Sequence, residues 1–455
     1  MPGLGGDCHV YHSISEAIRN SKVNRFHLTI MAICMTIVAV EGYDLVIYGS
    51  IKHQLIDEWG MTTVQAGMVG SVALIGMMVG SLSLGILADL LGRKPVLIFC
   101  FILFCVTTGL IGFTHEPISF SVGRFFAGVG IGGAMPNAIG LLSDYIPEKH
   151  KSTMIATTMS GMQVGGILAP LIAIAFGYGG WRHCFWIAFV PLVLLPVMIK
   201  LLPNSIDFSI KRGKTAELLR AVEKAAPGFT LPEVAQDTGT ESVSQKEKEK
   251  FPVRELFEEG RARNTFLFWI AFFMGLLMIY GLNTWLPELM QSAGYEVGSS
   301  LTFLLALNLA ALFGSFFMGR IADRVNTKYV LVTLYIIGAT CMVLLSIKSN
   351  IVVAYILISI CGICAFCPQN VGTAFVASNY PSRVRSTGLG VCNTVGRLGG
   401  IMGPTLGGIL MAAALPMFLN CVAFAVPGLI AATAYGLCVQ LRSAGKPTAA
   451  ELTHH

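Results

Sequence analysis

Charged side chains are scarce in this chain of 455 residues. Asp, Glu, Lys and Arg together make up 12% of the sequence, whereas soluble domains carry about 25%. Hydrophobic residues make up 54% of it, and the mean hydropathy is +0.69. So few charges cannot cover a soluble protein of this length. The composition therefore excludes a soluble globular protein and predicts an integral membrane protein.

Several chemical motifs are absent as well. The sequence contains no Gly-x-x-x-x-Gly-Lys-[Ser/Thr] loop, which argues against ATP as an energy source. No metal-ligand cluster or nucleophile–base pattern stands out, so we expect neither enzyme activity nor a cofactor. The polar tail before Asn24 has no apolar core, so we expect no cleaved signal peptide. The twelve cysteines lie in apolar segments and give no sign of disulfides.

Apolar runs of about twenty residues, the length of helix that crosses a bilayer, recur along the chain. We predict an all-α integral membrane fold with twelve transmembrane helices in two pseudo-symmetric halves of six. One span contains the letters of a dinucleotide-binding loop at 128–133, which we interpret as close helix packing because it lies in mid-helix. The predicted spans are 27–50, 65–89, 95–114, 118–143, 153–176, 183–202, 264–286, 299–321, 328–347, 350–376, 386–411 and 415–440.

The division into halves comes from a repeat with a constant offset of 234 positions. In an apolar chain, paired halves indicate a transporter with its substrate site between them. The repeated residues are Gly80, Gly85, Asp89, Lys94, Pro147, Gly165 and Pro170, which recur as Gly314, Gly319, Asp323, Lys328, Pro381, Gly399 and Pro404.

The apolar spans and the polar stretch between them give the domain organisation. We expect one amphipathic helix at about 214–226, inside a linker that carries both signs of charge. The predicted parts are a cytoplasmic N-terminal tail (1–26), a first six-helix bundle (27–202), a cytoplasmic linker (203–263), a second six-helix bundle (264–440) and a cytoplasmic C-terminal tail (441–455).

Lysine and arginine set the orientation. With both termini cytoplasmic, the outer loops hold only Lys52, Arg182 and Lys348 among the 31 basic residues. This asymmetry also accounts for the net charge of +6, so the charge gives no reason to expect a nucleic-acid partner. We expect a multi-pass protein of the bacterial cytoplasmic membrane, in contact with the lipid bilayer and monomeric.

A polar turn after the second span carries the first family resemblance. The segment from Gly85 to Lys94 resembles the loop signature G-x-x-x-D-R-x-G-R-K of the major facilitator superfamily, and the segment from Gly319 to Arg324 is its second copy. A glycine lets helices approach closely, and an Asp beside basic residues can form a salt bridge that holds one conformation. We therefore predict a conformational latch, formed by Gly85, Asp89, Arg93, Asp323 and Arg324.

Charged residues inside the spans point to the transport pathway, because a charge in hydrocarbon is costly. Glu41 and Asp44 are three residues apart and share a helix face. Asp44 and Arg124 each lie eight residues, or ~12 Å, from the outer boundary, counted from Lys52 and Glu116. A static ion pair that pins the first span to the fourth is the alternative explanation. Arg397 lies near the midplane with no acidic residue in its span, and its planar guanidinium matches a carboxylate.

The same residues sharpen the resemblance. The segment Glu41-Gly42-Tyr43-Asp44 resembles the first-helix signature D-G-x-D of the aromatic acid:proton symporter family, with Glu in place of the first Asp. The fourth span from Arg124 to Asp144 and the eleventh around Arg397 resemble the same family. The resemblance implies uptake of a benzoate-type or hydroxybenzoate-type acid together with a proton. It marks Glu41, Asp44 and Asp144 as proton-coupling positions, and Arg124 and Arg397 as arginines of the substrate site.

An aromatic acid also needs ring surfaces and polar groups around it. We expect these from the first, seventh and tenth spans: Tyr43, Tyr280, Asn283, Trp285, Gln369 and Asn370. The sequence thus predicts a proton-coupled symporter that imports an aromatic carboxylate by alternating access. It leaves open a transporter for a non-aromatic organic anion, such as a muconate, a dicarboxylate or a shikimate-like acid, and a sensor of such acids built on a transporter fold.

Overall fold

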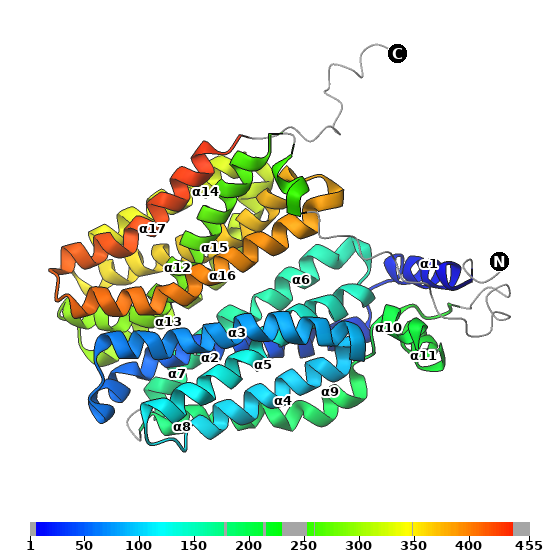
Figure 1. Cartoon of the computed structure of the whole chain (residues 1–455), viewed down its shortest axis with the longest axis horizontal. Coiled ribbons are helices and arrows are strands. Elements are labelled where there is room, and N and C mark those ends of the chain that lie inside the picture. Colours follow the sequence, from blue (N-terminus) through cyan, green and yellow to red (C-terminus); the bar gives the residue numbers. More distant parts are fainter. Residues whose placement is uncertain are drawn as a thin grey trace, which may run out of the picture. The chain divides into compact units, whose positions relative to one another are not determined.

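The computed structural model describes residues 6–176, 180–212, 215–229, 253–258, 260–347 and 349–439 (Figure 1). All regular elements in these ranges are helices. Ten helical segments there are long and apolar enough to cross a membrane. Two more long helices, α13 (Val297–Arg324) and α16 (Ser382–Ala412), fall on the remaining two predicted spans. The predicted all-α fold with twelve transmembrane helices is confirmed.

The chain divides into two compact units, residues 1–248 and 249–455. Six predicted spans lie in the first unit, and two of them are broken into shorter helices. Its elements are α2 (Arg25–Trp59), α3 (Thr63–Leu91), α4 (Arg93–Ile111), α5 (Pro117–Tyr145), α6 (Lys151–Met159), α7 (Gly161–Phe176), α8 (Arg182–Trp186), the 3₁₀ helix η3 (Ile187–Leu194) and α9 (Leu195–Leu201).

The fifth and sixth spans are broken for local reasons. In the fifth, α6 ends at Ser160, whose hydroxyl bonds the carbonyl of Thr157, and α7 begins at the following glycine. In the sixth, Pro191 lies inside η3 and Pro196 lies in the first turn of α9. A proline removes one helical hydrogen bond, so the tighter 3₁₀ pattern replaces the α-helix there.

The second unit repeats the first, and its six long helices are unbroken. Besides α13 and α16 it contains α12 (Ala262–Ser292), α14 (Thr327–Leu344), α15 (Ile351–Asn379) and α17 (Met417–Leu437), preceded by the 3₁₀ turn η5 (Val253–Phe257). Within it α12 packs on α16 and α17, α13 packs on α15, and α14 packs on α15 and α17. In the first unit α2 packs on α7, α3 on α5, and α4 on α5 and η3. Apart from the packing of α12 on α17, which is far more extensive than that of α2 on α9, the pairing order is the same in both units.

The 234-residue offset also holds at single contacts. A side chain on Gly128 of α5 would overlap the carbonyl oxygen of Ala73 on α3. The offset carries Ala73 to Leu307 and Gly128 to Gly362, and a side chain on Gly362 would overlap the carbonyl oxygen of Leu307. The glycines at 128–133 thus serve helix packing, as predicted.

Three short helices lie together at the end of the first unit where α2 begins (Figure 1). They are α1 (Gly6–Arg19), α10 (Ile206–Lys211) and α11 (Thr215–Ala225). The last of these is the predicted amphipathic helix, whereas α1 was not expected. Asn24 joins the group to α2: its amide oxygen accepts from the backbone amides at the start of α2, and its amide nitrogen donates to the last carbonyls of α11. Linker residues 230–252 and the whole C-terminal tail, 441–455, lie outside the described residues.

Candidate functional site

A buried ion pair joins the first and fourth predicted spans. Arg124 on α5 lies with Nη1 2.7 Å from Oδ1 of Asp44 on α2, and the two side chains are 2% and 0% exposed. The same Nη1 donates to the backbone carbonyl of Asp44 at 3.3 Å. Both side chains are within reach because α2 and α5 are in contact. The structure therefore brings together two residues 80 positions apart that the sequence placed at equal depth.

The surroundings of the pair are tight and apolar. The guanidinium carbon of Arg124 lies 5.4 Å from the centre of the Tyr48 ring, a distance at which the ring attracts the cation. Thr108 on α4 is fully buried as well. Glu41, one turn before Asp44 on α2, is 4% exposed. This unit thus encloses two carboxylates and one guanidinium in hydrocarbon-like surroundings.

Two other residues of α2 are buried within the first unit. The hydroxyl of Tyr43 donates to the backbone carbonyl of Cys184 on α8, a hydrogen bond that joins α2 to α8 within the first unit. Lys52 was taken as the outer boundary of the first span, yet α2 continues to Trp59 and Lys52 is fully buried within it. Helix α2 thus runs on beyond the end of the predicted span, and the pairing of Asp44 with Arg124 does not depend on where that span ends.

The second unit places Arg397 and Gln369 at the same level of α12. Gly396 of α16 packs on Leu276, and a side chain on Gly275 would lie 3.3 Å from Oε1 of Gln369 on α15. Tyr280, one turn along α12, lies against Gly400 of α16. Arg397, Gln369 and Tyr280 are each half-buried. Three helices of one unit thus carry these residues at neighbouring levels of α12.

The other predicted residues of the second unit differ in their exposure. Trp285 is fully buried and donates its indole N–H to the carbonyl of Pro404 at 2.8 Å. Asn283 is 5% exposed, donates to the carbonyl of Ile279 and accepts from Asn308 at 3.3 Å. Asn370 is exposed. The indole of Trp285 is thus engaged in packing α12 against α16.

The predicted latch has one visible contact in the first unit. Arg93, the first residue of α4, lies with Nη1 3.2 Å from Oδ1 of Asp144 on α5. Gly140 leaves room for this guanidinium, because a side chain there would lie 2.8 Å from it. A side chain on Gly85 would meet open space, and Asp89 is exposed. Arg324 is exposed at the end of α13, and the side chain of Asp323 lies outside the described part.

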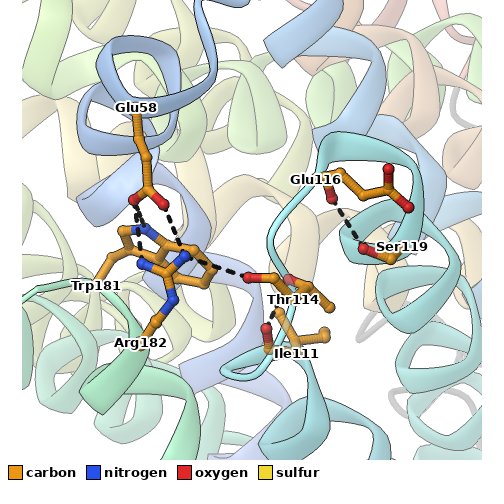
Figure 2. A network of polar contacts seen from close by, with 7 residues as sticks. All are labelled: Glu58, Ile111, Thr114, Glu116, Ser119, Trp181 and Arg182. Carbon is orange, nitrogen blue, oxygen red and sulfur yellow. Dashed lines mark hydrogen bonds and ion pairs between the residues drawn. The ribbon is translucent and has the colours of Figure 1, made fainter.

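Sequence reasoning missed a polar cluster at the opposite end of α2 from Arg25 (Figure 2). The Glu58 carboxylate accepts from both terminal nitrogens of Arg182, at 2.7 and 3.2 Å, and from the indole of Trp181 at 2.7 Å. Arg182 also donates to the carbonyl of Thr114, between α4 and α5. Over one hundred residues separate Glu58 from Trp181 and Arg182, so no local pattern could have linked them.

Two homologous six-helix units, with a buried ion pair between helices of the first and a half-buried arginine within a long helix of the second, define a membrane transporter of the two-bundle class. Among the described residues, no group of three His, Cys, Asp or Glu side chains is placed to hold a metal ion. The chain belongs to the Major Facilitator Superfamily, whose family model matches residues 34–404, and within it to the aromatic acid transporters.

Its relatives are named as transporters of aromatic acids, so the protein is a transporter rather than an enzyme. It is 39% identical to the benzoate transport protein of Acinetobacter baylyi, over 92% of this chain and 91% of that one. It is 33% identical to the gentisate transporter of Corynebacterium glutamicum, over 89% and 86%. It is 30% identical to a 4-hydroxybenzoate transporter of A. baylyi, over 87% of each chain.

Solved structures support the fold. The chain superposes on the partially occluded inward open xylose transporter XylE from E. coli with a TM-score of 0.70, at 14% identity over 90% of this chain and 97% of that one. A bacterial homologue of the human lysosomal transporter Spinster gives a TM-score of 0.69, at 16% identity over 91% and 97%. At these identities the likeness concerns the fold alone.

Proposed function

We propose that the protein imports a benzoate-type or hydroxybenzoate-type carboxylate together with a proton. The observation that carries the proposal is the fully buried Asp44–Arg124 pair beside Glu41. Relatives named for benzoate, gentisate and 4-hydroxybenzoate support the aromatic substrate. No other coupling ion or cofactor is needed for this scheme.

The proton step follows from the electrostatics of the pair. A buried ion pair is held by mutual attraction, and neutralising one member leaves the other charge uncompensated in a low-dielectric site. Protonation of Asp44 or Glu41 from the outer side weakens the hold on Arg124, so α2 and α5 can move apart. Release of the proton to the inside restores the pair. Asp144, held by Arg93, is the next candidate carrier.

The substrate carboxylate binds Arg397 in this proposal. Its planar fork offers two parallel N–H donors to a carboxylate, and Gln369 and Tyr280 at nearby levels of α12 supply an amide and a ring. The proposal also assigns Asn370, Asn283, Trp285 and Tyr43 to the substrate site, as the sequence predicts. Arg124 contributes through its charge balance with the two acids rather than by direct contact with the ring.

The proposal also covers the membrane location, the oligomeric state and the conformational latch. The protein lies in the bacterial cytoplasmic membrane as a monomer with both termini inside, and its two bundles alternate access to the site. The Arg93–Asp144 ion pair, with Gly85, Asp89, Asp323 and Arg324, stabilises one of the two conformations.

Uptake of labelled benzoate by expressing cells tests the proposal. We expect uptake to rise as outside pH falls and to collapse with a protonophore, whereas full activity without a proton gradient but with sodium would contradict it. A competition panel of aromatic and aliphatic acids then identifies the substrate class. Stronger competition by a muconate or a dicarboxylate than by hydroxybenzoates would replace the aromatic substrate with the non-aromatic one.

A further inference from the structure

A groove of about 480 Å³ lies on the surface of the first unit, between α2, α4 and α9. Its volume lies in the range of small-molecule sites. One wall is a stripe of α2 at helical spacing, from Arg25 through Leu28, Ala32 and Thr36 to Ile37. Leu194 and Val197, which are 39% and 41% exposed, form part of the opposite wall. The groove is open to the surroundings of the bundle and lined almost entirely by apolar groups.

The only charged residue that lines the groove lies at its end. Arg25 is the first residue of α2 and is exposed. Within the described chain, no carboxylate pairs with it. The hydroxyls of Thr29 and Thr36 bond carbonyls of their own helix, at 2.8 and 2.9 Å, and need no polar ligand. The groove therefore suits a ligand with one anionic end and a long apolar remainder.

The dimensions fit a lipid of one leaflet. From Arg25 to Ile37 the α2 stripe is twelve residues long, or ~18 Å at 1.5 Å per residue. Half of the hydrocarbon core of a bilayer is ~15 Å thick. A phosphate at Arg25 would place the acyl chains of the same molecule along the stripe. Ala32, in the middle, leaves the space that such a chain needs.

We infer that this groove is a binding site for an anionic phospholipid, whose phosphate pairs with Arg25 and whose acyl chain lies along α2. The inference goes beyond substrate transport. It concerns lipid binding in the leaflet that surrounds the N-terminal end of α2. Occupancy would brace α2, the helix that carries Glu41 and Asp44, against α9.

Native mass spectrometry of the purified full-length transporter tests the inference, with phosphatidylglycerol or phosphatidylethanolamine added in turn. We expect one phosphatidylglycerol to bind about five- to tenfold more tightly than phosphatidylethanolamine, since a basic side chain near anionic lipid contributes about that factor. Arg25→Gln should abolish the preference. Ala32→Phe, which fills the groove, should weaken the first bound lipid of either kind about tenfold.

Two matched variants serve as controls. Arg220→Gln removes an exposed charge on α11, and Leu110→Phe enlarges an exposed side chain on α4, both outside the groove. Both should bind lipid as the parent does. A retained preference in Arg25→Gln, unchanged binding in Ala32→Phe, or displacement of the lipid by benzoate would overturn the inference. Because the assay contains no transport step, these outcomes are independent of the proposed symport.

Discussion

Asp44 and Arg124 dominate the account at the scale of single residues. The pair is fully enclosed, so removing one partner alone would leave a stranded charge, at a cost of about 3–5 kcal/mol. A coupling carboxylate has to alternate between charged and neutral forms, whereas a structural one stays charged. These two roles predict different behaviour for the same substitutions.

Asp44→Asn should abolish accumulation of substrate, because a neutral isostere cannot carry a proton through the cycle. Exchange of labelled for unlabelled substrate across the membrane should survive, since exchange needs no net proton release. Glu41→Asp is the matched control: it restores the pattern of the resembled family and should transport nearly as the parent does. Accumulation and exchange are measured in the same cells at equal expression.

A structural role would give the opposite pattern. Asp44→Asn would then lower the thermal unfolding temperature, and the double variant Asp44→Asn, Arg124→Gln would recover accumulation by removing the stranded charge. Full accumulation by the double variant would assign Asp44 to the scaffold and make Asp144 the next carrier to test.

Arg397→Lys should raise the Kd for substrate about tenfold or more, although the charge is kept. Lysine loses the planar fork that binds both carboxylate oxygens. Arg385→Lys on the same helix is the control, because Arg385 is exposed near the start of α16 and should tolerate the change. Equilibrium binding in detergent measures both, and near-normal affinity in Arg397→Lys would move the carboxylate site elsewhere.

The sequence predicts charged residues better than aromatic ones. Asp44 and Arg124 could be paired in advance, because a charge in hydrocarbon needs a partner and helix rise fixes its depth. Trp285 could not be distinguished from a ring in a substrate site, because an aromatic side chain packs equally well between helices. Its bond to the carbonyl of Pro404 is a tertiary contact that no local pattern encodes.

Close helix crossings dominate at the scale of elements. Gly128 on α5 and Gly362 on α15 occupy equivalent positions, and in both a side chain would overlap a backbone carbonyl of the facing helix. Gly128→Ala and Gly362→Ala should each therefore destabilise the protein by about 1–3 kcal/mol. The thermal unfolding temperature of the purified variants measures the effect.

Gly85→Ala is the matched control for these crossings. A side chain there would meet open space, so alanine should leave the unfolding temperature unchanged or raise it slightly through its better helix propensity. Equal unfolding temperatures for all three variants would contradict the idea that the glycines set these crossings.

Helix existence was predictable, and helix continuity was not. Long apolar runs must be helical in a bilayer because every backbone group needs a partner. The break between α6 and α7 and the 3₁₀ segment η3 depend on how Ser160 and Pro191 settle against neighbouring helices. Helix α1 was not predicted because it has few apolar residues. Those it has, such as Ile14 and Ile18, are buried in contacts with other elements, among them α10 and α11.

At the scale of the whole molecule, the repeat explains why the two units have the same fold. The proposed function depends on the positions at which the two copies carry different residues. The offset of 234 carries Glu41 to Gly275 and Gln163 to Arg397. The first unit thus holds Glu41 where the second holds the glycine beside Gln369, and the second unit holds Arg397 where the first holds Gln163. In the proposed mechanism, equivalent frames therefore carry the proton site in one half and the carboxylate site in the other.

Substrate-driven proton movement in reconstituted vesicles tests this account most directly. With no initial pH gradient, labelled benzoate is added to vesicles that contain the parent or Asp44→Asn, and internal pH and label are followed together. Protein-free vesicles correct for the neutral acid, which crosses lipid unaided. We predict that the parent acidifies the interior in step with substrate entry and that Asp44→Asn gives neither above the protein-free level. Substrate entry by the parent without protein-dependent acidification would contradict proton symport.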